Sequence, residues 1–385
     1  MKTHLIGYYT TTFGELWDRS LYDLVEEAAL GVIRDTGLEL ADISAIFYGN
    51  MLSGIIENNV HATGKIAEVL NVSVPIYRTE AACASGGMAF QMAHTYLQAY
   101  PDKTVLVLGA EKMTDIGVND VTEALSAAAS GEEQAVGMTF PGLYGMLAQY
   151  YLRIYGYREE DLAAVAVKNH YHGTLNDKAQ FRREVTIDQV MKSTYIARPL
   201  KMLDSSPISD GASAVLLTNN KSHRKDNSVS VLSSQVATDS ISLKHRKRLD
   251  GLDATKQAAI KAFSDAKLRP SDIQVAELHD CFTIAELLAM EDIGFCKPGE
   301  AGKMVADQQT QLGKSSSLVI NSSGGLKASG HPVGATGIKQ LGELYLQLSK
   351  SAGKRQVAGA RYGLAQNVGG SGGTAVVTIL ASDNV

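Results

Sequence analysis

Short apolar runs alternate with amphipathic helical stretches along the first third of the chain. The runs Ser44 to Tyr48 and Thr104 to Leu108 each lead into a glycine, as buried strands of a parallel sheet commonly do. Apolar positions recur at helical spacing over Leu21 to Thr36 and again over Ala84 to Tyr100. This alternation of strands and helices predicts an α/β core.

The region from residue 115 to residue 196 does not follow this alternation of strands and helices. It contains a small-residue stretch over Ala124 to Gly131, a long amphipathic helix near Tyr144 to Tyr155 and a charged helix over Glu159 to His172. The strand pattern resumes at Asp210 to Leu217. We therefore expect residues 115–196 to form a mostly helical cap that is inserted into the α/β core.

The strand pattern near residue 210 is repeated close to the C-terminus. Asp210 to Leu217 and Ser371 to Thr378 share one layout, in which a glycine turn is followed by small residues and then a buried strand. The predicted helix after Cys83 contains Tyr96-Leu97-Gln98, and the helix predicted over Ile338 to Leu348 contains Tyr345-Leu346-Gln347. These matches indicate two related α/β halves.

The length of the chain also requires more than one unit. A chain of 385 residues is too long for one ordinary hydrophobic core. We place the boundary between the halves in the polar segment Asn219 to Asn227. The predicted domains are an N-terminal half over residues 1–225, which carries the cap as residues 115–196, and a C-terminal half over residues 226–385.

Charge and composition exclude several classes of protein. The formal net charge of −5 argues against a nucleic-acid binder, which is usually basic. The three cysteines lie far apart and form neither a disulfide framework nor a structural zinc motif. The chain contains no signal peptide and no apolar run of about eighteen residues, so we expect a cytoplasmic protein that does not enter a membrane.

The first candidate for chemistry is Cys83, in the run Glu80-Ala81-Ala82-Cys83-Ala84-Ser85-Gly86-Gly87. A helical pattern begins directly after it, so the thiol is predicted to lie on the first turn of a helix. The unpaired N–H groups and the dipole there would favour a nucleophilic thiolate. The alternative is a small buried apolar residue, which a free cysteine often is.

The second candidate is the segment Glu277-Leu278-His279-Asp280-Cys281-Phe282, which lies between a strand pattern over Ile273 to Leu278 and a predicted helix over Thr283 to Ile293. His279 and Cys281 can project from the strand end into one pocket. Either could transfer a proton, because both titrate near neutral pH once perturbed. The alternative is a buried turn with incidental polar residues.

The third candidate is the glycine-rich stretch Asn321 to Gly325 followed by Gly330-His331-Pro332-Val333-Gly334-Ala335-Thr336-Gly337. The glycines allow close backbone approach, and Pro332 helps to fix the loop that carries the imidazole. A histidine between glycine and proline, among further glycines, is the most specific of the three signals.

Taken in this order, the cysteine turn, the HDCF tetrapeptide, the GHPxGxxG loop and the terminal glycine-rich strand resemble a thiolase. The HDCF motif resembles the SCP2-thiolase-like group, which includes archaeal acetoacetyl-CoA thiolases. The resemblance covers nearly the whole chain. It implies the thiolase fold, in which duplicated βαβαβαββ halves form a five-layered αβαβα arrangement with an inserted helical loop domain.

The resemblance also assigns roles to individual residues. Cys83 would attack the thioester and carry the acetyl group, and His331 would accept its proton. Cys281 would remove the α-proton of a second acetyl-CoA. His279 would donate to the thioester oxygen in one oxyanion hole, and the N–H groups of Cys83 and Gly369 would form another.

Three departures from the common thiolase pattern affect these assignments. The usual Cys-x-Gly motif reads Asn367-Val368-Gly369 here, which leaves Cys281 as the acid/base thiol. Leu143-Tyr144-Gly145 stands where many thiolases have His-Met-Gly, and this bears on acyl-chain preference. The segment Ser205 to Gly211 matches the family's SGxNDG motif only in part, with Ser206 as a candidate contact for coenzyme A.

The function that the resemblance implies is an acetyl-CoA C-acetyltransferase, which condenses two acetyl-CoA reversibly to acetoacetyl-CoA and CoA without a metal or redox cofactor. It implies a homodimer or homotetramer. A role in HMG-CoA and mevalonate synthesis, with HMG-CoA synthase and a DUF35-type bridging protein as partners, is a further expectation. The alternatives are a 3-ketoacyl-CoA thiolase of longer chains, another condensing enzyme of the same fold, or a non-catalytic acyl-CoA- or lipid-binding scaffold.

Overall fold

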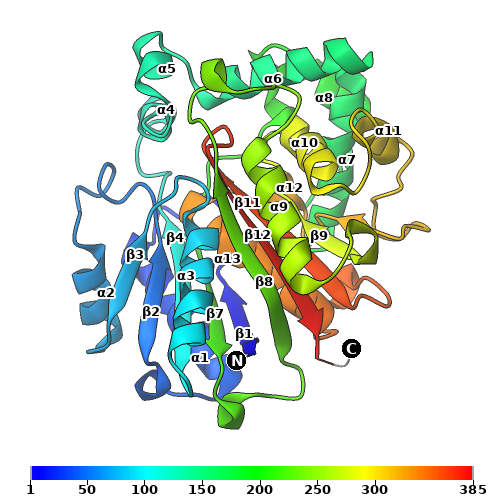
Figure 1. Ribbon diagram of the computed structural model, residues 1–385. Coiled ribbons are helices and arrows are strands. Elements are labelled where there is room, and N and C mark those ends of the chain that lie inside the picture. The colour runs from blue at the N-terminus through cyan, green and yellow to red at the C-terminus, as the bar shows by residue number, and fades with distance from the viewer. Residues whose placement is uncertain (1, 384–385) are drawn as a thin grey trace.

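The computed structural model describes residues 2–383, and two similar sets of strands make up its large sheet (Figure 1). Within the described residues the strand order is β10-β9-β11-β12-β8-β1-β7-β4-β2-β3. The first five strands belong to the C-terminal part of the chain and the last five to the N-terminal part. The two sets meet where β1 and β8 pair antiparallel.

The N-terminal set begins with β1 and ends with β7, which returns antiparallel beside both β4 and β1. Its strands and helices are β1 (Thr3–Thr10), α1 (Leu21–Thr36), β2 (Ala45–Gly49), α2 (Ala62–Leu70), β3 (Ile76–Thr79), α3 (Ser85–Ala99), β4 (Thr104–Glu111) and β7 (Gly211–Thr218).

The C-terminal set repeats this order of elements with two additional short helices, so the duplication predicted from the sequence is confirmed. Its members are β8 (Val229–Thr238), α9 (Asp253–Ala266), β9 (Val275–Glu277), α10 (Thr283–Ile293), α11 (Ala301–Ala306), β10 (Val319–Ile320), α12 (Gly325–Ser329), α13 (Val333–Leu348), β11 (Tyr362–Gly369) and β12 (Thr374–Ser382).

Helices cover the half-sheets on both sides and produce five layers. Helix α1 packs on β1 and β7, and α9 packs on β8 and β12, in the two outer layers. Helices α3 and α13 pack against each other between the half-sheets. Apolar side chains of both central helices, such as Phe90 and Leu341, share one buried core with strands of both halves.

The predicted inserted cap lies between β4 and β7. It consists of α4 (Val118–Ser126), α5 (Gly131–Ala135), α6 (Phe140–Tyr155), α7 (Glu159–Thr174), α8 (Ile187–Lys192) and the short pair β5 (Tyr195–Ala197) and β6 (Leu200–Lys201). These helices gather at one end of the sheet (Figure 1). Over residues 2–383 no helix has both the length and the apolar character that crossing a bilayer requires.

Candidate active site

Cys83 lies in the loop between β3 and α3, at the cap end of the sheet. Helix α3 begins at Ser85, so the thiol precedes the helix by two residues and is not on its first turn. Ala82 adopts a left-handed backbone with φ of 50°, which is unfavourable for a residue with a Cβ. The Glu80 carboxylate accepts the Ala82 N–H at 2.6 Å, and the Ser85 hydroxyl donates to the Ala82 carbonyl at 2.6 Å. The loop is therefore held in a strained conformation that turns Cys83 toward the pocket.

The environment of Cys83 keeps its thiol protonated. Burial raises its pKa to about 12, although the N–H groups of Gly370 and of Cys83 itself act in the opposite direction. The expectation that the start of the helix would favour a thiolate is therefore wrong for the resting site, because loss of solvation outweighs the nearby donors. The thiol needs a base that accepts its proton as it attacks.

His331 lies in the loop between α12 and α13 and offers such a base. Its Nδ1 lies 2.7 Å from the Thr336 hydroxyl, whose own proton goes to the Pro332 carbonyl at 2.9 Å. Because that hydroxyl has one proton, it accepts from Nδ1–H of His331. Nε2 is then left unprotonated. Burial lowers the pKa of His331 to about 3, so the ring is neutral.

His279 has the opposite tautomer because of Asn367. The Gly87 N–H donates to Oδ1 of Asn367 at 3.1 Å, which fixes the orientation of the amide. Nδ2 of Asn367 therefore donates to the Cys83 carbonyl at 3.0 Å and faces Nδ1 of His279 at 3.2 Å. Since Nδ1 accepts, Nε2 carries the proton. Nε2 is buried and has no hydrogen-bond partner among residues 2–383, and burial and the nearby His331 keep the pKa of His279 well below its usual value.

The three groups lie close together. The sulfur of Cys83 and one ring nitrogen each of His279 and His331 are within 4.8 Å of one another. The two imidazole rings meet edge to face, with centroids 5.1 Å apart. A soft divalent metal could bind such a set. Without one, the set offers a nucleophile, a proton acceptor and a proton donor around one point, which suits acyl transfer.

Cys281 shares a pocket with Cys83. Both thiols line a cavity of about 320 Å³ together with His331, Tyr144 and Phe282, and most of the remaining lining is apolar. Cys281 is 7% exposed, and burial followed by the nearby Cys83 raises its pKa. The structure thus brings all four predicted catalytic residues to one end of the sheet.

Of the remaining predicted residues, Ser206 lies at this pocket and Gly369 directly precedes Gly370, which lines it. Ser206 lines it, and its N–H donates to the Cys281 carbonyl at 2.9 Å. Gly369 is the last residue of β11, but the N–H that faces the Cys83 sulfur belongs to the next residue, Gly370. The roles predicted for Ser206 and for the N–H of Gly369 stay predictions.

Two buried carboxylates that sequence reasoning missed hold the catalytic loops. Asp280 accepts the N–H groups of Leu326 and Lys327 at 2.6 and 3.3 Å, which ties the HDCF turn to the helix before His331. Glu111, at the end of β4, accepts the N–H groups of Met51 and Gly334 at 3.0 and 3.1 Å. Asp280 stood inside the HDCF motif, whereas nothing in the pattern around Glu111 indicated its role.

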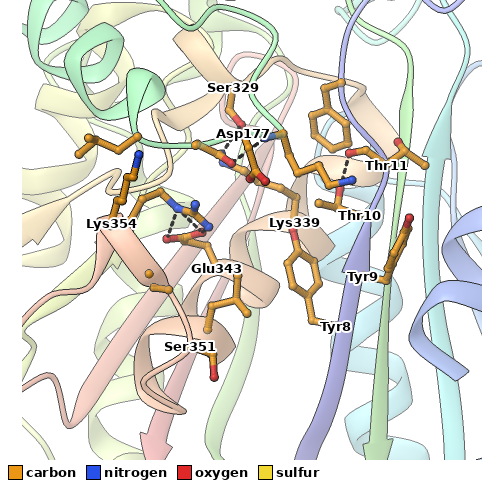
Figure 2. A pocket seen from close by; sticks show the side chains of 18 of the residues that line it. Tyr8, Tyr9, Thr10, Thr11, Asp177, Ser329, Lys339, Glu343, Ser351 and Lys354 are labelled. Carbon is orange, nitrogen blue, oxygen red and sulfur yellow. Dashed lines mark hydrogen bonds and ion pairs between the residues drawn. The ribbon is translucent and has the colours of Figure 1, made fainter. Parts of the chain in front are cut away.

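A larger cavity, of about 590 Å³, lies apart from the two thiols (Figure 2). None of the four predicted catalytic residues lines it. Its buried charges are already paired, since Glu343 lies 3.0 Å from Arg355 and Lys339 lies 3.5 Å from Glu277. We therefore place the reaction in the smaller cavity, which the two thiols and His331 line, with a ring nitrogen of His279 within 4.8 Å of the Cys83 sulfur.

Family models match both parts of the chain. The model described as the thiolase N-terminal domain matches residues 4–221, and the one described as thiolase C-terminal domain-like matches residues 235–382. Curated relatives named "Acetyl-CoA acetyltransferase" come from Methanothermobacter thermautotrophicus, at 45% identity, and Methanocaldococcus jannaschii, at 42%. Each alignment covers 98% of this chain and 98% of the relative.

More distant similarities extend the comparison. Sterol carrier protein 2 of Bos taurus is 34% identical over 98% of this chain and 72% of its own length. The solved structure titled "Ltp2-ChsH2(DUF35) aldolase" has a TM-score of 0.85 at 23% identity and covers 100% of this chain and 98% of its own. At 23% sequence identity, the structural match is evidence for the fold alone.

Proposed function

The chain belongs to the thiolase family, and we propose that it is an acetoacetyl-CoA thiolase, which joins two molecules of acetyl-CoA and catalyses the reverse thiolysis. The observation that carries this proposal is the pair of neutral imidazoles in opposite tautomers beside Cys83, with Cys281 in the same pocket. Both archaeal relatives are named acetyl-CoA acetyltransferase, which supports acetyl-CoA as the substrate.

The first half-reaction transfers an acetyl group to Cys83. Nε2 of His331 takes the thiol proton while the sulfur attacks the carbonyl carbon of acetyl-CoA. The N–H of Cys83, with that of Gly369 or Gly370, stabilises the oxyanion that forms, and each such donor contributes roughly 2.7–4 kcal/mol in acyl transfer. The carbon–sulfur bond to CoA then breaks, and the CoA thiolate takes a proton from Cys281. This leaves an acetyl thioester on Cys83, a protonated His331 and a Cys281 thiolate.

The second half-reaction forms the carbon–carbon bond. The Cys281 thiolate removes an α-proton from the second acetyl-CoA, and Nε2–H of His279 donates to the enolate oxygen. The enolate carbon attacks acetyl-Cys83, and acetoacetyl-CoA leaves as the carbon–sulfur bond breaks. The Cys83 thiolate recovers its proton from His331, so the site returns to its resting state with no cofactor consumed.

The partner predictions remain proposals. Condensation of two acetyl-CoA is unfavourable at equilibrium, so synthesis in this direction needs an enzyme that removes the product. We propose HMG-CoA synthase for that step, as the entry to mevalonate, and a DUF35-type protein that bridges the two enzymes. The fold match to a protein solved with a DUF35 chain supports the second partner. Affinity purification of the tagged chain from its native cell tests both, and recovery of neither would contradict them.

The test of the function is thiolysis of acetoacetyl-CoA by free CoA. We expect the wild-type protein to cleave this substrate, and Cys281→Ala to lose at least about a thousandfold in kcat, because Cys83, the other thiol that lines the pocket, carries the acyl group and cannot take over the proton transfer. Cys296→Ala is the matched control, since Cys296 lies in a turn outside the pocket. Cleavage of longer 3-ketoacyl-CoA alone would identify a longer-chain thiolase, and no cleavage with any chain length would favour a scaffold.

A further inference from the structure

Tyr144 lies against both thiols and belongs to the cap, not to any of the three sequence motifs. Its side chain is 1% exposed, and its ring packs on Phe282 with centroids 4.8 Å apart and planes tilted by 31°. The phenol lines the cavity that contains Cys83 and Cys281. The Tyr144 hydroxyl donates to the carbonyl of Gly370 at 3.1 Å.

The Tyr144 hydroxyl is also within hydrogen-bonding reach of the Cys281 sulfur. A hydroxyl has one proton and can also accept, so two arrangements are open to it. With Cys281 as a thiol, the S–H can donate to the phenol while the phenol donates to Gly370. With Cys281 as a thiolate, the phenol can donate its proton to the sulfur.

The proposed reaction leaves Cys281 as a thiolate between its two halves. That thiolate persists while CoA leaves and the second acetyl-CoA enters. Its pocket is largely apolar, so the buried anion is costly even with the protonated His331 in the same lining. Among the residues that line the pocket in residues 2–383, Tyr144 supplies a hydroxyl to that sulfur. Hydrogen bonds to charged groups are stronger than those between neutral groups.

We propose that Tyr144 is a positioning residue for Cys281, whose hydroxyl turns from the Gly370 carbonyl to the Cys281 sulfur and stabilises the thiolate between the half-reactions. This inference rests on the proposed function, because it takes Cys281 as the acid/base. The contact of the Tyr144 ring with Phe282 positions the Tyr144 hydroxyl. The hydroxyl in turn sets how readily Cys281 gives and takes a proton.

The test compares Tyr144→Phe with the wild type. The variant keeps the ring on Phe282 and removes only the hydroxyl. We expect kcat for acetoacetyl-CoA thiolysis to fall about 10- to 100-fold with KM within about twofold, because one hydrogen bond to a charged group is lost. The limb of the pH–rate profile that reports Cys281 should move to higher pH by about one unit. Acetylation of Cys83 by acetyl-CoA should reach the wild-type extent.

Two further measurements separate this role from a structural one. Tyr151→Phe removes the hydroxyl of a tyrosine that is also buried on α6 but bonds to Glu291 away from the pocket, so it should keep the wild-type kcat and pH profile. Alkylation of Cys281 by iodoacetamide, followed by peptide mass spectrometry, should be about tenfold slower in Tyr144→Phe at any given pH.

The outcomes distinguish the inference from the proposed function. Wild-type kcat and pH profile in Tyr144→Phe would overturn the inference. A loss of kcat with an unshifted profile and an unchanged rate of Cys281 alkylation would assign Tyr144 a packing role only, which also overturns it. If the wild type does not cleave acetoacetyl-CoA, the proposed function fails, while the alkylation rates still decide whether Tyr144 supports the Cys281 thiolate.

Discussion

Two histidines of the site carry their protons on different nitrogens, and a neighbouring side chain decides each case. The Thr336 hydroxyl accepts a hydrogen bond from Nδ1–H of His331, which keeps the proton on Nδ1 and leaves Nε2 as a base. Asn367 donates to Nδ1 of His279 and leaves Nε2 as a donor. The same two rings in exchanged tautomers would present the wrong group to the thiol and to the substrate oxygen. The different roles of the two rings therefore depend on Thr336 and Asn367, neither of which lines the cavity.

The resting thiol gives a first prediction at this scale. Because burial raises the pKa of Cys83 to about 12, the sulfur is protonated below that pH and its thiolate fraction rises about tenfold per pH unit. Alkylation of Cys83 by iodoacetamide, followed by peptide mass spectrometry, should increase in that proportion between about pH 7 and pH 9 without levelling off. A plateau near neutral pH would show instead that Cys83 rests as a thiolate paired with a protonated histidine.

Asn367 gives a second prediction. Asn367→Ala removes the amide that orients His279 and holds the Cys83 carbonyl. We expect kcat for thiolysis to fall roughly a hundredfold, as when one oxyanion donor is lost. Steady-state kinetics measures this, and an unchanged melting temperature excludes unfolding. Activity near the wild-type level would contradict the tautomer assigned to His279.

At this scale the sequence singled out four side chains that the fold brings together, but not their protonation states. Glycine and proline around His331, and the short HDCF motif, are local signals, and the residues that they mark lie close to Cys83 in the fold. The pKa of Cys83 was predicted in the wrong direction, since desolvation depends on groups from the cap and from β11 that meet only in the folded chain. Tyr144 was visible only as an unusual residue in the cap.

At the scale of elements, each reactive group stands in a loop that joins a strand or a short helix to a longer helix. Cys83 precedes α3, His279 and Cys281 precede α10, and His331 precedes α13. Loops of this kind keep their shape only when their backbone groups have fixed partners. Buried carboxylates supply several of them here, and Glu111 supports two loops at once.

Glu111 gives the third prediction. One carboxylate oxygen accepts the N–H groups of Met51 and Gly334, and the other accepts the N–H of Leu52 and the amide of Asn50. In Glu111→Gln the new NH2 would face two of these donors. We expect a loss of about 1–3 kcal/mol in the free energy of unfolding.

Urea unfolding measures this loss, at a pH above about 7, the raised pKa of Glu111, so that the wild-type group is ionised. Glu26→Gln, at an exposed position on α1, is the control and should change stability little. An equal effect of the two substitutions would refute the supporting role of Glu111.

Most elements could be predicted because their periodicity is local. Leu21–Thr36 and Thr283–Ile293 are helices with the bounds expected from the sequence. Helix α13 begins at Val333, five residues before the expected start at Ile338, because glycines and small residues at its first turns hide the helical pattern. Those residues are small because another helix lies against them.

Over the whole molecule, the site forms where the two related halves meet. Helix α3 from one half and α13 from the other cross near their N-termini, and there a Cβ on Gly337 would lie 2.3 Å from the Gly87 nitrogen. A Cβ on Gly86 would lie 2.6 Å from the Gly334 carbonyl oxygen. This close approach brings the loops of Cys83 and His331 together. The repeated strand layout predicted the halves, but not which helices would touch.

Gly337→Ala gives the fourth prediction. The added methyl has no room between the central helices, so the halves must shift, at a cost of about 1–3 kcal/mol in the free energy of unfolding. We also expect acylation of Cys83 to slow, because its distance from His331 changes. Gly131→Ala, with open space around the new Cβ, is the control and should leave both quantities unchanged or improve stability slightly. Wild-type stability and acylation in Gly337→Ala would contradict the close approach.

The most direct test of the proposed chemistry is to detect the acetyl group on the enzyme after incubation with acetyl-CoA, by mass spectrometry of the Cys83 peptide. The account predicts acetyl-Cys83 in the wild type and in Cys281→Ala, with acetoacetyl-CoA formed only by the wild type. It predicts little acetyl-Cys83 in His331→Ala, because the thiol has lost its base. Acetylation at Cys281 instead, or equal acetoacetyl-CoA synthesis by Cys281→Ala, would contradict the division of roles between the two thiols.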